Sequence, residues 1–284
     1  MKIIFFGTPE YVLPILKLVH KKFIMGTVSP IVAVVTQTPK PAGRKQKPQY
    51  SAVDRWAHEH KIPIFYNFQQ LPDADMGICA AFGLIIPKST VDAFPLGILN
   101  IHPSLLPKYR GASPVQETIM EGVSQTGVTI IKMDEKVDHG PIVVQFKEEV
   151  NKDDTTGILQ ERLFSRAADV LVETIPAYVA GKIKPKEQNH KEATFTKRLT
   201  KEDGFISFSK EDPNKAELFI RAMNPWPMAW TYIRTDKLDS QSKRLKILKA
   251  HTEDRKLILD EVQLEGKNPV AWKQFSQAYP DFNF

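Results

Sequence analysis

The chain has 284 residues, of which 42% are hydrophobic and 25% are charged. This balance is ordinary for a folded globular protein, and the length suits one large domain with a smaller second one. The single cysteine, Cys79, excludes a framework of internal disulfides and is expected in the core. No apolar stretch is long enough to cross a membrane and no secretory signal opens the chain, so we expect a cytoplasmic protein with no membrane partner.

The formal net charge is +6 and the sequence pI is near 9.1. A basic balance of this size permits a polyanionic partner but does not require one. The basic residues fall in short clusters, and each cluster taken alone is most often a solvated surface.

Short apolar runs alternate with amphipathic segments in the first part of the chain, which is typical of α/β proteins. Strands are expected at residues 2–6, 31–36, 62–66 and 76–82, with helices after the first, second and fourth. Thr8 is expected to cap the first helix, and Ser51 the second. Only Gly7 is present where dinucleotide-binding proteins carry three glycines, so that class has no support.

Residues 37–48 form an unusually long connection. They contain three prolines, one glycine and four basic side chains, which predicts an exposed and partly stiffened loop. A loop of this length in a compact domain usually has a function, although a plain surface connection is the alternative.

A polar motif follows the apolar run 97–99. In a strand, side chains two apart share a face, so Asn100 and His102 are predicted side by side where the strand ends. In open α/β sheets, ligands bind at the carboxyl ends of the strands. Pro103 and Pro107 then make the exit loop rigid. The alternative is a strand end whose polar pair is merely satisfied.

Residues 100–111 read Asn-Ile-His-Pro-Ser-Leu-Leu-Pro-Lys-Tyr-Arg-Gly and resemble the signature of the 10-formyltetrahydrofolate-dependent formyltransferases. That family carries a third catalytic residue, an aspartate in a downstream loop, and Asp138 matches it. The resemblance implies that Asn100, His102 and Asp138 are catalytic. It also implies an α/β formyltransferase fold with a Rossmann-like open, mostly parallel twisted sheet.

The resemblance implies 10-formyltetrahydrofolate as the formyl donor and co-substrate. The loop around residues 82–87 offers a glycine and apolar walls that suit a pterin ring. Packing of Leu84 and Ile85 in the core is the alternative there. The residues expected to contact folate are Phe82, Gly83, Leu84, Ile85, Ile86, Ser104, Leu105, Leu106, Pro107, Val137 and Gly140.

The long loop resembles the insertion that methionyl-tRNA formyltransferases press against the acceptor end of tRNA. Arg44, Lys45 and Lys47 are therefore expected to bind nucleic acid, because phosphate contacts dominate such affinity. The Lys-Glu-Asp-Gly motif ending at Gly204 and the Asn-Pro-Trp-Pro motif ending at Pro227 resemble the same branch, which implies initiator methionyl-tRNA as the partner. The tryptophans are expected to pack in the core.

The three polar side chains suit the chemistry of formyl transfer. Asn100 can donate to a developing oxyanion, His102 can donate and shuttle a proton, and Asp138 can orient the imidazole and favour its charged form. No serine or cysteine pairs with this histidine, so direct transfer is favoured over a covalent acyl-enzyme. No metal is needed.

The second half predicts strands at 126–133 and 141–150 and a long amphipathic helix to residue 180. We expect a catalytic domain at 1–182, a connector at 183–203, and a small, shortened, β-rich domain resembling an OB barrel at 204–284. We expect a monomer. Two other functions stay open: formylation of a small amine, such as a nucleotide-linked amino sugar or glycinamide ribonucleotide, and non-catalytic binding of folate or tRNA.

Overall fold

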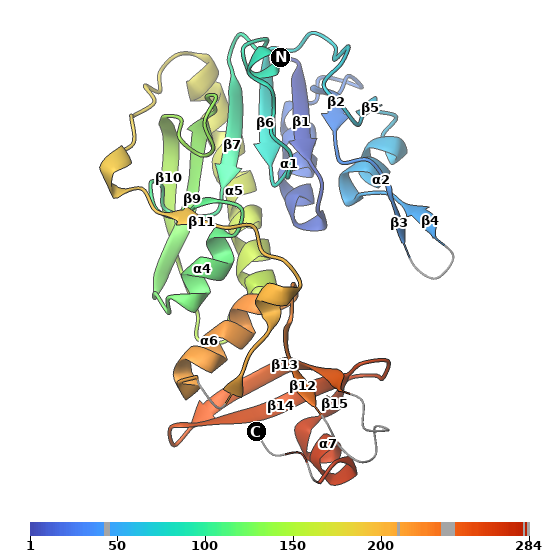
Figure 1. Cartoon of the computed structure of the whole chain (residues 1–284). Coiled ribbons are helices and arrows are strands. Elements are labelled where there is room, and N and C mark those ends of the chain that lie inside the picture. The colour runs from blue at the N-terminus through green and yellow to red at the C-terminus, as the bar shows by residue number, and fades with distance from the viewer. Residues whose placement is uncertain (43–45, 209–210, 234–241, 281, 283–284) are drawn as a thin grey trace. The chain divides into compact units, whose positions relative to one another are not determined.

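The structure is a computed structural model that describes residues 1–284 except 43–45, 209–210, 234–241, 281 and 283–284 (Figure 1). The chain forms two compact units. The first contains Met1–Ala112, Gln125–Glu149 and Gln160–Thr196, and the second contains Ser113–Ser124, Val150–Leu159 and Lys197–Phe284.

A seven-stranded sheet forms the centre of the first unit, in the order β10-β9-β7-β6-β1-β2-β5. Its five parallel strands are β1 (Ile3–Gly7), β2 (Ile31–Val35), β5 (Ile64–Phe65), β6 (Met76–Ala80) and β7 (Ile98–His102). The strand β9 (Gln125–Lys132) is antiparallel to β7, and β10 (Ile142–Glu149) is antiparallel to β9. The predicted open, mostly parallel α/β sheet is confirmed.

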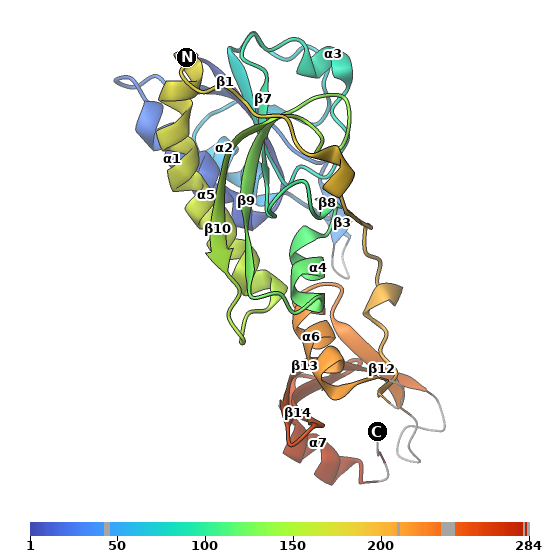
Figure 2. The ribbon, with the colours of Figure 1, turned by 90° about the vertical axis from the view of Figure 1, so that its left-hand side faces the viewer.

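Both faces of this sheet are covered, which explains why its inner strands are apolar at successive positions. Every residue of β1 and β6 is buried. The helix α1 (Leu13–Phe23) and the helix α5 (Thr156–Val179) lie on the same face of the sheet (Figures 1 and 2). Leu163, Ala167 and Leu171 recur at helical spacing on α5 and are fully buried.

The start of the first helix differs from the prediction. Thr8 does not cap it; Pro9 precedes a short 3-10 turn, η1 (Glu10–Val12), which leads into α1. The Thr8 hydroxyl instead donates to the carbonyl of Phe82, 3.2 Å away across the carboxyl edge of the sheet. The Thr8 side chain therefore binds a carbonyl that is distant in sequence instead of capping the helix.

The long loop after β2 contains a small hairpin. Its strands β3 (Lys40–Ala42) and β4 (Lys47–Gln49) pair antiparallel. The following helix α2 (Ala52–Glu59) begins as predicted, because the Ser51 side chain accepts the Asp54 N–H at 3.0 Å.

Four shorter elements border the carboxyl edge of the sheet. The helix α3 (Lys88–Val91) follows the segment after β6. The strand β8 (Arg110–Gly111) pairs in parallel with β11 (Phe195–Thr196), which follows the short turn η2 (His190–Glu192). The predicted connector thus contributes a strand beside the exit loop of β7.

The second unit contains an antiparallel sheet in the order β12-β13-β14-β15. These strands are β12 (Ala229–Ile233), β13 (Lys243–Glu253), β14 (Lys256–Leu264) and β15 (Val270–Ala271). The accompanying helices are α4 (Pro114–Met120), α6 (Pro213–Met223) and α7 (Trp272–Ala278), with the turn η3 (Glu202–Gly204). A β-rich C-terminal portion is confirmed, and its closure into a barrel stays a prediction.

One face of this sheet packs on the core and the other carries aromatic and basic side chains. Ile233, Leu245 and Ile247 belong to the core. On the other face, Trp230 lies opposite Lys246 and Tyr232 opposite Arg244. Trp230 is buried as predicted, but Trp226 is 48% exposed, so the expectation of core packing was wrong for that residue.

Among the described residues, no helix combines the length and hydrophobicity needed to cross a membrane.

Candidate functional site

The candidate site begins at the end of β7, an interior strand between β6 and β9. Asn100 and His102 are two residues apart on this strand, and both side chains turn to the same acceptor. The prediction that they share a face is confirmed. His102 is 4% exposed and Asn100 is half-buried, so Asn100 is the more accessible of the two.

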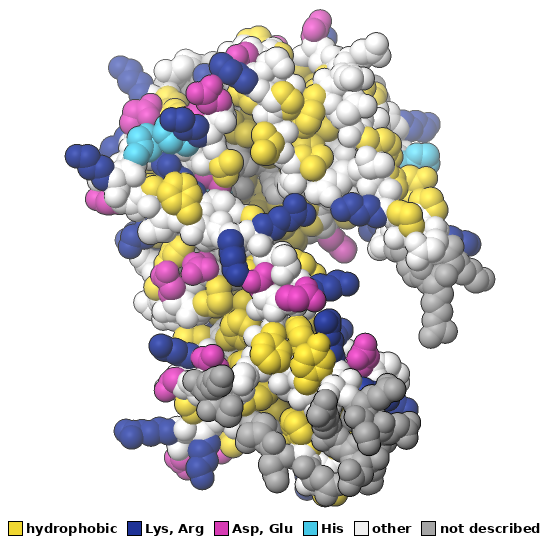
Figure 3. All heavy atoms as spheres, viewed as in Figure 1, with side chains coloured by type: hydrophobic (Ala, Val, Ile, Leu, Met, Phe, Trp, Pro, Cys, Tyr) yellow, Lys and Arg dark blue, Asp and Glu magenta, His cyan; other side chains and the backbone are white. Residues whose placement is uncertain are grey.

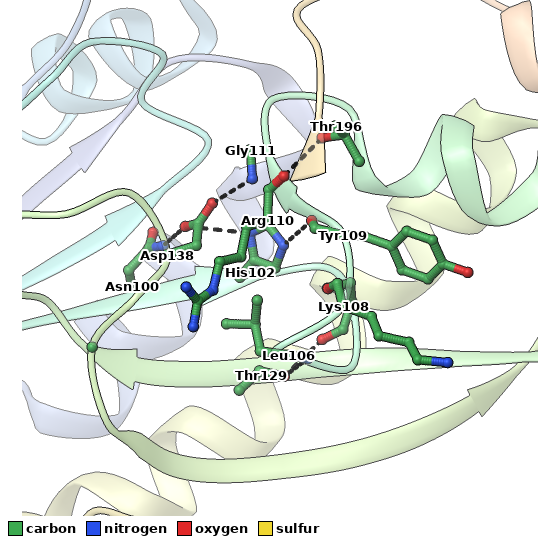
Figure 4. A network of polar contacts seen from close by, with 12 residues as sticks. Asn100, His102, Leu106, Lys108, Tyr109, Arg110, Gly111, Thr129, Asp138 and Thr196 are labelled. Carbon is green, nitrogen blue, oxygen red and sulfur yellow. Dashed lines mark hydrogen bonds and ion pairs between the residues drawn. The ribbon is translucent and has the colours of Figure 1, made fainter. Parts of the chain in front are cut away.

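That shared acceptor is the carboxylate of Asp138, on the loop between β9 and β10 (Figure 4). The Asn100 Nδ2 donates to Asp138 Oδ1 at 3.1 Å, and His102 Nδ1 lies 3.4 Å from the same oxygen. The backbone N–H of Gly111 donates to the second oxygen, Oδ2, at 2.9 Å. One carboxylate therefore joins β7, β8 and the β9–β10 loop.

The electrostatics of Asp138 follow from its neighbours. Burial of the carboxyl would raise its pKa, because water no longer solvates the charge. The charge and hydrogen bond of His102, the Gly111 N–H and the Arg110 guanidinium act in the opposite direction. Together they hold the pKa of Asp138 below its ordinary value, so the group is ionised at neutral pH.

Both ring nitrogens of His102 face acceptors. Its Nε2 lies 2.9 Å from the carbonyl oxygen of Tyr109, to which it can donate, while Nδ1 faces the Asp138 carboxylate. The sequence analysis expected His102 to donate directly to an oxyanion, but here both nitrogens are directed to protein groups.

The exit loop of β7 is held by hydrogen bonds to its backbone. The Ser104 hydroxyl donates to the Lys108 carbonyl at 2.7 Å, and Thr129 on β9 accepts the Leu106 N–H at 3.1 Å. Ser104 and Leu106 are both buried. The loop is therefore a fixed part of the site, as its two prolines predict.

A pocket of about 450 Å³ lies between α3 and the loop that carries Asp138. It is lined by Lys88, Val91, Asp92, Met133, Asp134, Glu135, Lys136 and His139. Its volume is in the range of small-molecule sites, and its lining combines apolar and charged groups.

Comparisons with known proteins identify the family. The formyl transferase family model matches residues 1–175, and the model of the formyl transferase C-terminal domain matches residues 198–257. The chain belongs to the formyl transferase family.

Curated members of this family resemble the chain over nearly its whole length. The methionyl-tRNA formyltransferase of Roseiflexus castenholzii is 37% identical over 298 residues, covering 95% of this chain and 93% of the relative. That of Geotalea daltonii is 33% identical, covering 98% and 96%. The chain is therefore an enzyme of the formyltransferase class.

Solved structures share the fold. Methionyl-tRNA formyltransferase from Clostridium thermocellum matches with a TM-score of 0.59 and 22% identity, covering 93% of this chain and 98% of that one. An N-formyltransferase from Helicobacter canadensis, in complex with folinic acid and dTDP-3-aminofucose, matches with a TM-score of 0.66 and 18% identity, covering 95% and 98%.

The residues predicted to contact folate fall in three environments. Gly83, Leu84, Ile85 and Val137 are exposed, with Ile85 at 83%, so core packing of Leu84 and Ile85 is excluded. Those that are buried are Phe82, Ile86, Ser104, Leu106 and Gly140, and those of intermediate exposure are Leu105 and Pro107. The exposed members are the ones free to meet a ligand directly, and the role of the whole set stays a prediction.

Of the residues predicted to bind nucleic acid, Lys47 is exposed on β4. Arg44 and Lys45 lie outside the described residues.

The sequence analysis missed a second layer of polar residues behind Asp138. Arg110, Gln188 and His190 are joined by hydrogen bonds, and Gln188 reaches the backbone of the Asp138 loop. Gln188 and His190 lie in the polar stretch taken as a connector. The sequence around these residues did not indicate their hydrogen bonds, because their partners are distant in sequence.

Cys79 provides a chemical test of burial at this site. Burial, together with the nearby Asp138 charge, raises the pKa of its thiol to about 12, so very little thiolate exists near pH 8. We expect a thiol reagent at pH 8 to modify the folded protein roughly a hundredfold or more slower than the unfolded protein, which should release one equivalent. A Cys79→Ala variant is the control. Rapid stoichiometric labelling of the folded protein would contradict the packing described.

Proposed function

We propose that this formyl transferase moves a formyl group from 10-formyltetrahydrofolate to the amino group of initiator methionyl-tRNA, and that Asn100, His102 and Asp138 are its catalytic residues. The observation that carries the proposal is the meeting of these side chains on one carboxylate at the carboxyl edge of the sheet. Curated relatives with this activity in their names, which the chain covers almost completely, support the choice of reaction.

The reaction needs a donor for an oxyanion and a path for a proton. The attacking amine forms a bond to the formyl carbon, and the carbonyl oxygen becomes negative. Asn100 uses one N–H on Asp138, which leaves its other N–H for this oxygen. The His102 ring, whose Nδ1 lies 3.4 Å from Asp138 Oδ1, orients that carboxylate beside the reacting atoms.

The proton then moves from the amine to the leaving group. Asp138 is ionised and only 10% exposed, so it can accept the proton lost by the attacking nitrogen. The bond from the formyl carbon to the folate nitrogen breaks, and that nitrogen takes up a proton. The products are the formylated amine and tetrahydrofolate, and no covalent enzyme intermediate is formed.

The proposed place of the formyl donor is beside Asp138. The exposed apolar side chains of Leu84, Ile85 and Val137 offer surfaces for a flat ring. The segment with Leu84 and Ile85 leads into α3, which forms one wall of the 450 Å³ pocket. Val137 lies on the loop that forms the other wall, next to Asp138. The Helicobacter canadensis N-formyltransferase, which shares the fold, is in complex with folinic acid.

The acceptor is proposed to be a tRNA because two exposed surfaces suit nucleic acid. The first is the hairpin of β3 and β4 with its basic residues. The second is the outer face of the β12–β13 sheet, where Tyr232 is 51% exposed and lies opposite Arg244, and Lys246 lies opposite Trp230. Figure 3 shows hydrophobic side chains with Lys and Arg side chains close by in this part of the molecule. Aromatic rings stack on bases and basic side chains bind phosphates.

For location, oligomeric state and domain boundaries, we propose what the sequence predicts. We propose a cytoplasmic monomer, with domain boundaries at 182 and 203 and a C-terminal barrel shortened relative to the family. Sugar formyltransferases share the fold at low identity, which gives a small amino sugar less support as the acceptor.

The central experiment is a formylation assay. Purified protein, given 10-formyltetrahydrofolate and charged initiator tRNA, should produce formylmethionyl-tRNA. The Asn100→Ala variant should lose roughly a hundredfold to a thousandfold in kcat, because an oxyanion donor is removed. Asp138→Asn, which keeps the shape but not the charge, should lose at least as much.

The assay also separates the rival functions. Turnover of a nucleotide-linked amino sugar or glycinamide ribonucleotide, without turnover of charged tRNA, would contradict the proposed acceptor. Equal activity of wild type and both variants would contradict the proposed residues.

The basic hairpin provides a second test. Replacing Arg44, Lys45 and Lys47 by Gln should raise KM for tRNA and leave kcat nearly unchanged. The salt dependence of tRNA binding should also become shallower, by roughly 0.9 per lost phosphate contact in a log–log plot. Binding measured across a salt series checks both effects.

A matched control removes the same charge elsewhere. Lys17, Lys21 and Lys22 are exposed on α1, and their replacement by Gln should change neither KM nor the salt slope. Equal effects of the two triple variants would show that only net charge matters and would contradict a binding role for the hairpin.

A further inference from the structure

Asp138 has a backbone conformation that needs support. Its φ is +49°, in the left-handed region that residues with a Cβ seldom adopt. Such conformations persist where surrounding contacts hold them, and they often occur at functional sites. The question is which contacts hold this one.

A single side chain holds the backbone on both sides of the loop's turn. Gln188 is 5% exposed, and its Nε2 donates to the carbonyl of Asp138 at 2.9 Å and to the carbonyl of Gly140 at 2.7 Å. Gly140 is itself in tight contact, since a Cβ there would meet the Lys132 carbonyl oxygen at 1.9 Å. The loop is therefore clamped from outside the strand pair that carries it.

The clamp is fixed in turn by Arg110. The Arg110 Nη2 donates to Gln188 Oε1 at 2.7 Å, which leaves Nε2 as the only amide group able to face the two carbonyls. Arg110 is 3% exposed and directly precedes Gly111, whose N–H binds the Asp138 carboxylate. The contacts thus form a closed path from the Asp138 carboxylate through Gly111, Arg110 and Gln188 to the Asp138 carbonyl.

A pair of imidazoles closes the outer side of this path. Arg110 Nη2 lies 2.8 Å from His190 Nδ1, and because guanidinium can only donate, this nitrogen is the acceptor. The His190 ring stacks on His139 with centroids 4.0 Å apart and planes 5° from parallel. His139 is in turn bound to Asp134 at 2.6 Å.

We propose that Gln188, oriented by Arg110, is a positioning residue that holds Asp138 where its carboxylate meets Asn100 and His102. This inference rests on the proposed function for its kinetic consequences. Gln188 touches none of the reacting groups; it acts through the Asp138 backbone. An amide is required at this position, because its nitrogen donates to the carbonyls of Asp138 and Gly140 while its oxygen accepts from Arg110.

The first test is the Gln188→Met variant, which keeps the length of the side chain and removes its hydrogen bonds. Displacement of a catalytic group by about 1 Å can cost up to a hundredfold, so we expect kcat to fall roughly tenfold to a hundredfold with KM values little changed. Asn189→Ala is the matched control, because that neighbouring exposed side chain hydrogen-bonds to Glu192 rather than to the groups around Asp138 and its loss should have no effect.

A pH profile separates positioning from general damage. The titratable groups around Asp138 are His102 on β7, Arg110 on β8 and the Cys79 thiol on β6, with Asp134, His139 and His190 on the far side of Arg110. When the carboxylate leaves His102 and Gly111, burial remains and its pKa rises. The acidic limb of kcat should therefore move to higher pH in Gln188→Met, and an unmoved limb would contradict the proposal.

Gln188→Glu tests the orientation of the amide. This variant still accepts from Arg110 but presents a carboxylate oxygen to the two carbonyls, so we expect a loss at least as large as for Met. Wild-type activity in Gln188→Glu would show that anchoring Arg110 is the only role of residue 188, and would overturn the proposal.

Hydrogen exchange gives a readout that does not depend on the reaction. The amides of residues 134–140 should exchange faster in Gln188→Met than in wild type and Asn189→Ala, while the strands β1 and β6 stay protected. Unchanged exchange in this loop would overturn the proposal even if the protein formylates tRNA. Faster exchange in a protein that forms no product would leave the clamp standing and refute the proposed function.

Discussion

The site depends on one buried carboxylate that binds donors from distant parts of the chain. Asp138 binds Asn100 and the His102 ring from β7 and the Gly111 N–H from β8. A carboxylate in this position is stable only because these donors replace the water lost on burial. Removal of any donor leaves the others with an incompletely solvated charge, so the members of the site behave as a unit rather than as separate contributors.

The fold prepares this meeting point from both sides. The interior position of β7 aims alternate side chains to one face, and the antiparallel return of β9 brings the Asp138 loop back over that strand. The exit loop is fixed through Thr129, which also lies on β9. The same two strands therefore set both the polar side chains and the backbone around them.

Local features of the site were readable from the sequence. The alternation of Asn100 and His102 follows from strand geometry alone, and the Ser51 cap follows from its spacing to Asp54. Asp138 was identified by resemblance, because the contact of residues 38 positions apart has no local signature. Asp138 lies beside Asn100 because β7 and β9 are neighbours in the sheet.

Features that depend on tertiary partners were not readable. Thr8 looks like a helix cap, but the carbonyl of Phe82, 74 residues away, takes its hydroxyl. For Leu84 and Ile85 the sequence left core packing open beside a role in binding a flat ring, and only the structure excludes the core, because both are exposed. Gln188 lies in a polar stretch without periodicity, and its partners are 50 and 78 residues away. Hydrophobic pattern reports burial of apolar faces, and it carries no information about which polar groups meet inside.

The measurement that tests this account most directly is a carbon-13 NMR titration of the Asp138 carboxyl in the folded protein, assigned with Asp138→Asn. The account predicts a pKa below the ordinary aspartate value, moving upward when His102 is replaced by Ala. An ordinary or raised pKa in the wild type, or one that does not respond to the loss of His102, would contradict the claim that this carboxylate joins the site.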